Sequence, residues 1–296
     1  TFITRSGTNT ARLRLNALTR TGGTISFVDG TVADTDTTNT NNILGGWATV
    51  GNDWAMNSTN GADGAITAFS SYNGTLPSSG AGSSVANYTL NGTQTQTSTV
   101  AANTVRIAGT GSGDTLALGG NALTITSNGG ADVGGLLYVG GGDDVYNITN
   151  TSGSGINASS ATALIITTVT GTLDVSATIN GGNGARNLIK AGAGTLVVSS
   201  ANAYTGAVRV YGGVLRVANN TATGTTAGGI DIQNGAALEL SNSVAVGNEG
   251  LTITGMGVSD GGALRNVASN TSSYAGGVTI GTSGARINSD AGGALT

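Results

Sequence analysis

Short apolar segments, each broken after a few residues by glycine or asparagine, are the feature that most limits how this chain can fold. Many of them alternate apolar and polar side chains, which is the period of a β-strand with one buried face. The clearest are Thr195–Ser199, Ala207–Val210, Val214–Val217, Ile230–Ile232 and Ala237–Leu240. Glycine supplies 52 of the 296 residues and proline only 1, so turns are frequent and collagen or polyproline rods are excluded. The pattern predicts an ordered all-β fold with few helices.

The scarcity of large side chains favours a β-solenoid over a β-sandwich. The chain has 2 Trp, 7 Tyr and 3 Phe, fewer than the core of a large sandwich normally uses. Short, similar strands suit a narrow core in which each coil is covered by the next one. Disorder is disfavoured because disordered tracts usually combine low hydrophobicity with high net charge, and the net charge here is only -4.

Missing residue types remove several classes of function. With 0 His and 0 Cys, the chain has no Ser-His-Asp triad, no His-ligated metal, no thiolate and no disulfide. Its 11 basic residues form no dense stripe, and no apolar run reaches the roughly 18 residues of a membrane-spanning helix. The nearest basic set is interpreted as a solvated strand face: Arg5, Arg12, Arg14 and Arg20. We therefore expect no catalytic activity, no nucleic-acid partner and no membrane insertion of this segment.

A motif of glycine, tyrosine and alternating apolar residues fills the region from residue 188 to residue 217. Its members are Leu188, Lys190, Gly192, Gly194, Thr195, Leu196 and Val198, then Asn202, Tyr204, Thr205 and Gly206, then Val208, Val210, Gly213, Leu215 and Val217. The motif resembles the autotransporter-associated β-strand repeat. The resemblance implies a right-handed parallel β-helix that is secreted or displayed at the cell surface, and it implies no catalytic activity.

Two further segments are similar to sequences that accompany this repeat, namely Gly261–Asp290 and, less closely, Ile43–Trp54. We expect residues 1–296 to form a single β-solenoid segment with loop insertions, cut from a longer chain. Residues 181–240 hold the best-matched repeat copy, and residues 1–90 are the candidate for a loop-rich section. In the repeat copy, Leu196 and Val198 are predicted to face inward and Val197 outward.

Acidic residues offer weak candidates for a metal or catalytic site. Asp143 and Asp144 follow three glycines, a context similar to a calcium-binding nonapeptide, and paired carboxylates can also hydrolyse glycosides. A turn in which aspartate accepts a local hydrogen bond is the favoured interpretation. Asp29, Asp34 and Asp36 lie in a polar stretch that fails the EF-hand pattern and is interpreted as a solvated loop. No cofactor is expected, and calcium is the one alternative.

Trp47 and Trp54 flank a glycine-rich segment, and both are candidates for a glycan contact or for packing. The main functional hypothesis is a structural, extracellular or cell-surface rod, stalk or filament. Its expected partners are copies of itself end to end or other segments of the same chain. The alternatives are an adhesin that binds a surface glycan and a polysaccharide-degrading β-helix enzyme.

Overall fold

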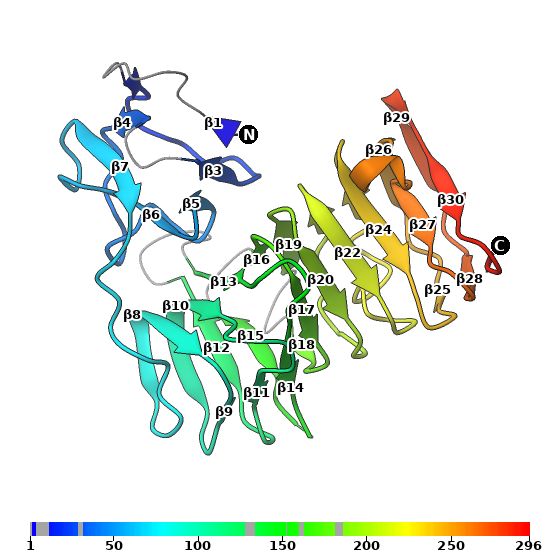
Figure 1. Cartoon of the computed structure of the whole chain (residues 1–296), viewed down its shortest axis with the longest axis horizontal. Coiled ribbons are helices and arrows are strands. Elements are labelled where there is room, and N and C mark those ends of the chain that lie inside the picture. Colours follow the sequence, from blue (N-terminus) through cyan, green and yellow to red (C-terminus); the bar gives the residue numbers. More distant parts are fainter. Residues whose placement is uncertain are drawn as a thin grey trace.

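The computed structural model describes residues 2–3, 12–28, 32–127, 134–151, 153–159, 163–180 and 186–296. In these residues the chain forms two parts (Figure 1). A seven-stranded sheet occupies residues 2–68, and stacked parallel strands follow from residue 82 to residue 295. The first part is called the N-terminal sheet below, and the second part is called the solenoid.

The solenoid has three faces, and each face is built from strands of successive coils. The first face contains β8 (Gly82–Asn91), β10 (Val100–Ala108), β13 (Gly135–Val139), β16 (Ala163–Thr168), β19 (Asn187–Ala191), β21 (Val208–Val210), β23 (Ile230–Ile232), β26 (Leu251–Gly255) and β29 (Val278–Ala285). The second contains β9 (Gln94–Thr95), β11 (Thr115–Ala117), β14 (Val145–Thr149), β17 (Thr172–Val175), β20 (Thr195–Val198), β22 (Gly213–Val217), β24 (Ala236–Leu240), β27 (Leu264–Asn266) and β30 (Ile287–Ser289).

The third face is the least regular. It contains β12 (Leu123–Thr126), β15 (Ile156–Ser159) and β18 (Ile179–Asn180), and then β25 (Ala245–Val246), β28 (Thr271–Tyr274) and β31 (Ala294–Leu295). The long strand β10 joins the first and third faces, since its two halves pair with β13 and β12. The one helix in the described residues is the three-residue 3-10 turn η1 (Val258–Asp260), and none of the helical structure described there could cross a membrane. The prediction of an all-β solenoid is confirmed.

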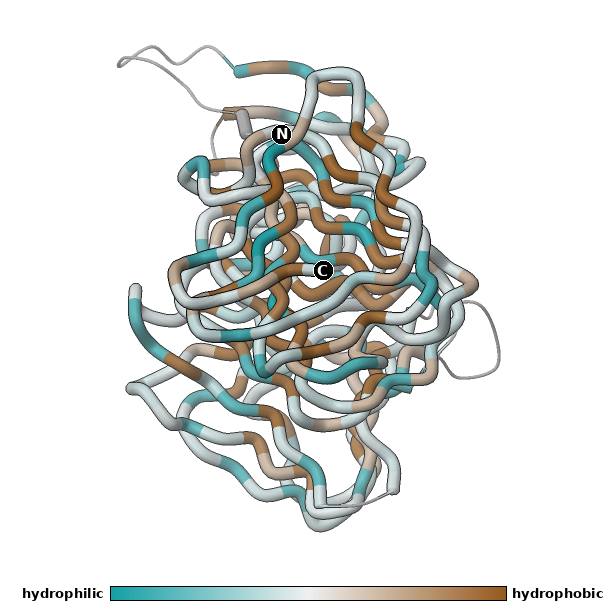
Figure 2. The backbone as a smooth tube through the Cα atoms, turned by 90° about the vertical axis from the view of Figure 1, so that its right-hand side faces the viewer, coloured by the Kyte–Doolittle hydropathy of each residue, from teal (hydrophilic) through white to brown (hydrophobic). Residues whose placement is uncertain are grey.

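A single apolar core runs through the solenoid because inward side chains stack in register from coil to coil. Ile166, Lys190, Val210, Ile232 and Ile253 occupy successive positions of one such row. Seen from the C-terminal end, hydrophobic stretches recur from one coil to the next (Figure 2).

The second face shows the predicted alternation. Leu196 and Val198 are fully buried members of this core, whereas the outward Val197 is not part of it. A single coil cannot cover its own apolar side. The stability of the solenoid therefore comes from the stacking of neighbouring coils.

Lys190 is the one polar member of that row and the only lysine in the chain. It is fully buried, and its ammonium donates hydrogen bonds to the carbonyl oxygens of Ala191 at 2.7 Å, Gly192 at 2.9 Å and Gly212 at 3.0 Å. The three donors of an ammonium group thus have three acceptors at the corner between the first and second faces.

The N-terminal sheet contains β1 (Phe2–Ile3), β2 (Leu13–Arg14), β3 (Ile25–Phe27), β4 (Ala33–Thr35), β5 (Ala48–Val50), β6 (Asp53–Asn57) and β7 (Gly64–Ala68). Its strands run in the order β1-β3-β5-β6-β7-β4-β2 and include both parallel and antiparallel pairs. It has its own small core, in which Phe27, Ala48 and Ile66 are fully buried.

This sheet packs on the outer side of the first face of the solenoid (Figure 1). Ile43, Trp54 and Phe69 form one buried cluster with Leu137 of β13. The two backbones approach closely at Gly46, where a Cβ atom would lie 2.5 Å from the carbonyl oxygen of Gly134.

Polar contacts also join the two parts. Arg106 of β10 forms an ion pair with Asp53 at 2.8 Å, and Tyr72 donates a hydrogen bond to the same carboxylate at 3.1 Å. Burial and the neighbouring Asp53 raise the pKa of Tyr72, so the tyrosine stays neutral and donates. Asn87 donates to the carbonyl oxygen of Asn41 at 2.6 Å.

Candidate ligand-binding cleft beside the N-terminal sheet

A cleft of about 690 Å³ opens where the N-terminal sheet meets the first face of the solenoid. One wall comes from β3 and β5 with their flanking turns, and the other comes from β16, β19, β21 and the turns that follow them. Its volume lies within the range of roughly 300–1,000 Å³ that is typical of small-ligand sites.

The cleft exists because the outer surface of the first face changes character along the solenoid. In one outward row, Ile165 and Ile189 are followed in register by Arg209, Asp231 and Thr252. The isoleucines are buried under the N-terminal sheet, whereas the later positions remain uncovered. The cleft therefore lies at the border between a covered apolar surface and an open polar one.

Trp47 comes from the turn before β5 and packs on the cluster of Ala163, Ile165 and Ile189. It is half-buried, so part of its indole ring remains open to the cleft. Gly45 is required beside it, since a Cβ atom there would lie 2.3 Å from the indole nitrogen. Trp47, one of the two tryptophans singled out in the sequence, thus lies in the cleft.

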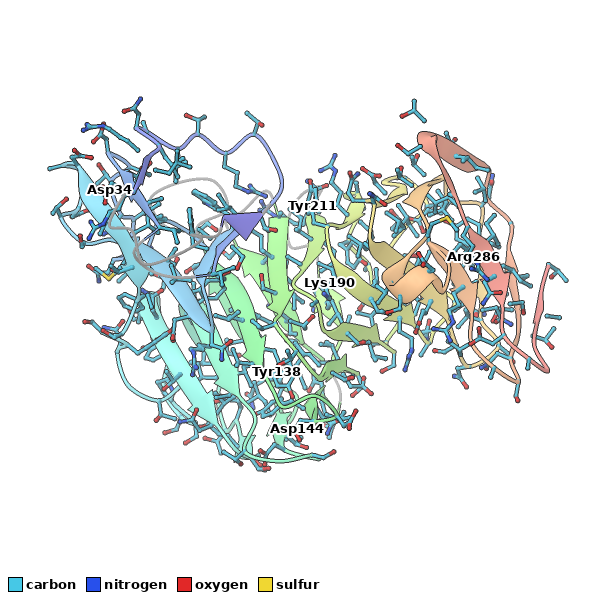
Figure 3. The ribbon with its side chains drawn as sticks, turned by 45° about the horizontal axis from the view of Figure 1, so that its top comes forward. Asp34, Tyr138, Asp144, Lys190, Tyr211 and Arg286 are labelled. Atoms are coloured by element: carbon cyan, nitrogen blue, oxygen red, sulfur yellow. The ribbon has the colours of Figure 1, made fainter. Side chains whose placement is uncertain are left out.

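Tyr211 directly follows β21 and faces the N-terminal sheet (Figure 3). Its ring packs on the same apolar cluster as Trp47, and its hydroxyl accepts a hydrogen bond from the backbone N–H of Gly23 at 3.1 Å. Within the described residues this hydroxyl donates no hydrogen bond, which leaves its proton available in the cleft.

Several polar side chains of the cleft have no side-chain hydrogen bond within the part of the chain that the structure describes. They are Thr24, Ser26, Thr49, Thr167 and Asn234. Thr49 and Thr167 are only 4% and 6% exposed. Both residues line the cleft, where water or a ligand can bond their hydroxyls.

Among the described residues, the lining of the cleft has no charged side chain and one titratable group, Tyr211, while Arg20 at the rim donates a hydrogen bond to the carbonyl oxygen of Gly23 at 2.9 Å. Glycines supply much of the remaining lining, and at Gly51 and Gly235 a Cβ atom would meet nothing within 4 Å. The described lining therefore offers two aromatic surfaces, hydroxyl and amide groups and bare backbone, and its own side chains include no acid and no cation.

Trp54 lies elsewhere. Its side chain is 0% exposed and packs against Ile43, Phe69 and Leu137, under the N-terminal sheet. Its indole nitrogen has no hydrogen-bond partner among the described residues. The structure therefore separates the two tryptophans: Trp54 packs between the two parts, and only Trp47 reaches the cleft.

Asp34 and Asp144, from the two acidic candidate sets, lie in different parts of the molecule and both lie away from Tyr211 of the cleft (Figure 3). Asp144 accepts a hydrogen bond from the N–H of Gly141 at 2.7 Å in an exposed turn, and the neighbouring Asp143 is exposed. No group of three or more acidic residues that could hold a metal ion occurs in the described residues. Calcium binding at Asp143 and Asp144 therefore stays a prediction, and no further acidic residue of the described chain joins these two in a cluster.

Asp34 and Asp36 pair with the N-terminal arginines. Arg12 contacts Asp34 at 2.9 Å, and Arg14 contacts both Asp36, at 3.5 Å, and Asp63. These pairs neutralise Arg12 and Arg14, which disfavours a phosphate site at those two residues. Asp29 and Arg5 lie outside the described residues.

Sequence reasoning missed Tyr211, Thr49, Thr167 and Asn234 as members of one site. Tyr211 stands within the repeat copy, directly before Gly212 and Gly213, and nothing in its local sequence marks it as a member of the site. Its contact with Gly23 spans 188 residues of sequence, and no local pattern encodes such a contact.

Comparisons with known proteins agree with the motif and the architecture. Residues 188–217 match the family model of the passenger-associated-transport-repeat. The chain is similar to the adhesin BmaC autotransporter of Brucella suis biovar 1 (strain 1330), with 34% identity over 240 residues. The match covers 77% of this chain and 6% of that protein, so the chain spans a small fraction of its relative. No solved structure matches it. The chain is thus a parallel β-solenoid that carries a passenger-associated transport repeat and is related in sequence to an autotransporter adhesin.

Proposed function

We propose that this segment is part of the rod of a surface-displayed or secreted, autotransporter-type adhesin and that it has no catalytic activity of its own. The observation that carries the proposal is the stacking of parallel coils over one core, with a passenger repeat at residues 188–217 in its middle. Such a stack extends a chain away from a surface without a large globular core.

The chemistry of the cleft supports a non-catalytic role. Catalysis of hydrolysis generally needs a positioned acid, base or nucleophile. Within the part of the chain that the structure describes, Tyr211 is the one titratable residue in the lining of the cleft, and the paired candidates Asp143 and Asp144 lie in an exposed turn. We expect the unaltered protein to cleave no polysaccharide. If any cleavage is detected, the Asp144→Asn variant should show the same rate.

Surface display is tested on intact cells of the native host. Antibodies raised against residues 12–296 should label intact cells or the culture medium, and external protease should remove the cell-bound label. Labelling that appears only after the cells are permeabilised would contradict the proposal. An abundant cytoplasmic protein, probed in parallel, reports whether the cells stayed intact.

The expected partner for the ends of this rod is another β-solenoid coil, from the same long chain or from a second copy. On the last coil, Val278, Ile280 and Ile287 continue core rows and are 39%, 55% and 48% exposed. A further coil of the same kind would cover these side chains and pair with the free strand edges.

A further inference from the structure

We propose that the cleft beside the N-terminal sheet binds an uncharged oligosaccharide, with Trp47 and Tyr211 as the aromatic surfaces against which sugar rings lie. The proposal does not depend on the surface role of the rod, because it concerns a site of stated chemistry on the chain itself. Its evidence is the convergence of two half-buried aromatic rings and unpartnered hydroxyls in one cleft.

The aromatic residues give the cleft an apolar platform. Trp47 and Tyr211 both pack on Ile165 and Ile189, so each ring is fixed from behind while part of it faces the cleft. A sugar ring has one face of C–H groups and a rim of hydroxyls, and amphipathic aromatic side chains suit that combination. Because the rings are held in place before binding, little conformational entropy is lost when a ligand arrives.

The polar groups match the rim of a sugar. Thr49 and Thr167 approach the cleft from opposite walls, and each carries a hydroxyl without a side-chain partner in the described residues. A hydroxyl both donates and accepts, as does the amide of Asn234, so the three can bond sugar hydroxyls in either direction. Bare backbone at Gly51 and Gly235 leaves room for a ring to approach.

Charge decides the class of sugar. Sialylated, sulfated or phosphorylated glycans need a cation or a cluster of backbone donors. Among the described residues the lining itself contains no Arg or Lys. Arg20 lies at the rim, where its guanidinium is engaged by the carbonyl oxygen of Gly23 at 2.9 Å, and Arg209 lies beyond the cleft in the neighbouring polar groove with Asp231. A neutral oligosaccharide leaves no charge unpaired in the cleft, which makes it the occupant that the lining favours over an acidic one.

The test uses the whole 296-residue chain on an array of immobilised neutral oligosaccharides, with sialylated and sulfated oligosaccharides and a set of extended peptides on the same array. We expect at least one neutral oligosaccharide to be retained and the acidic ones to be rejected. Binding to no neutral oligosaccharide, a preference for acidic ones, or retention of peptides alone would each overturn the proposal.

Two adjacent threonines of β16 give a matched pair of variants for the best array ligand. Thr167 faces the cleft, whereas the hydroxyl of Thr168 is buried inside the solenoid without a partner. Thr167→Val should weaken the calorimetric affinity about two- to tenfold, which corresponds to the loss of one hydrogen bond. Thr168→Val should leave it unchanged. An equal loss in both variants, or in neither, would overturn the assignment.

Two further variants bracket the result. Trp47→Ala should abolish measurable binding, and Asn234→Ala, at the exposed edge of the cleft, should weaken it without affecting the core. Asn91→Ala, at an exposed position on the first coil outside the cleft, is the control for Asn234→Ala and should bind normally. Because Asn234 and Asn91 are exposed, neither substitution should disturb the packing of the core.

Discussion

At the scale of single residues, Lys190 shows how a charged side chain can be held in the apolar core when each of its donors has a partner. Lys190 occupies an inward position between Ile166 and Val210 of the neighbouring coils, and burial lowers its pKa. Its three carbonyl partners lie where the chain turns from the first face to the second. Carbonyl oxygens at such a corner point inward and cannot all pair with the next coil, which explains a lysine in the repeat.

Removal of that lysine should be costly. Lys190→Met keeps the apolar stem but leaves buried carbonyl oxygens without a donor, so we expect a loss of about 2–3 kcal/mol in the free energy of unfolding. Urea denaturation followed by circular dichroism measures it. Ile166→Met, on the coil before, is the control and should cost less than about 1.5 kcal/mol. Equal losses for the two variants would show that the carbonyl contacts contribute nothing.

Glu249 illustrates the opposite case, a buried acid with an incomplete set of partners. It is 1% exposed, and Thr223 donates a hydrogen bond to one of its oxygens at 2.7 Å, while the other has no partner in the described residues. Burial raises its pKa above the ordinary value of 4.5. The stability contributed by this group is therefore complete below pH 4.5 and is lost as pH rises through the higher folded-state pKa.

Glu249→Gln should consequently raise the melting temperature at pH 7 and change it little at pH 4. The side chain keeps its shape, but the cost of a buried negative charge is removed. Glu239→Gln is the matched comparison, because Glu239 forms ion pairs with Arg216 at 2.7 Å and Arg265 at 3.1 Å. It should lower the melting temperature at pH 7. A destabilised Glu249→Gln at pH 7 would mean that the carboxylate is stabilised there.

At the scale of elements, the alternation of apolar and polar residues was sufficient to predict the strands of the second face. The inward Leu196 and Val198 and the outward Val197 lie as the pattern indicated. The pattern fails on the first face, where Leu164, Ile165 and Ile166 of β16 are all buried, because a second layer covers the outer side. The continuous apolar run in β16, in a chain in which many strands alternate, was the local indication that a second layer covers this face.

The layer itself could not be predicted, because its contacts join residues far apart in sequence. Trp54 meets Leu137, and Gly23 meets Tyr211. Residues 1–90 were expected as a candidate loop-rich section, and the structure places seven strands in residues 2–68, with the first solenoid strand β8 at Gly82–Asn91. The cleft forms where these two layers meet. Local sequence patterns therefore could not predict which residues of the two layers line it together.

Close backbone approach holds the two layers together, so a small change at Gly46 should separate them. In Gly46→Ala the new methyl group would lie 2.5 Å from the carbonyl oxygen of Gly134, and backbone on both sides must shift. We expect faster protease cleavage within residues 12–68 and a red-shifted tryptophan fluorescence, since Trp54 gains access to water. Gly111→Ala, where a Cβ atom meets nothing within 4 Å, should leave both readouts unchanged.

At the scale of the whole molecule, stacking gives the solenoid its core, because each coil covers the apolar side of its neighbour. Ile280 lies in register with Ile253, and Ile287 with Leu264, so both continue core rows that the last coil leaves uncovered. Repetition of a contact between such an uncovered surface and a different surface of a second copy gives a ring where the rotation closes and a filament where it does not. Association of this chain should therefore depend on a few apolar side chains at one end.

The isolated chain should associate as its concentration rises, and the double variant Ile280→Thr with Ile287→Thr should sediment as a smaller species at the same concentration. Threonine keeps the β-branched shape that suits a strand while it lowers the apolar area available for a partner. Val28→Thr provides the control, because Val28 is 56% exposed but belongs to the N-terminal sheet rather than to a core row. Sedimentation velocity distinguishes the outcomes. If Val28→Thr dissociates the oligomer and the double variant does not, the isolated chain associates through the N-terminal sheet and not through Ile280 and Ile287.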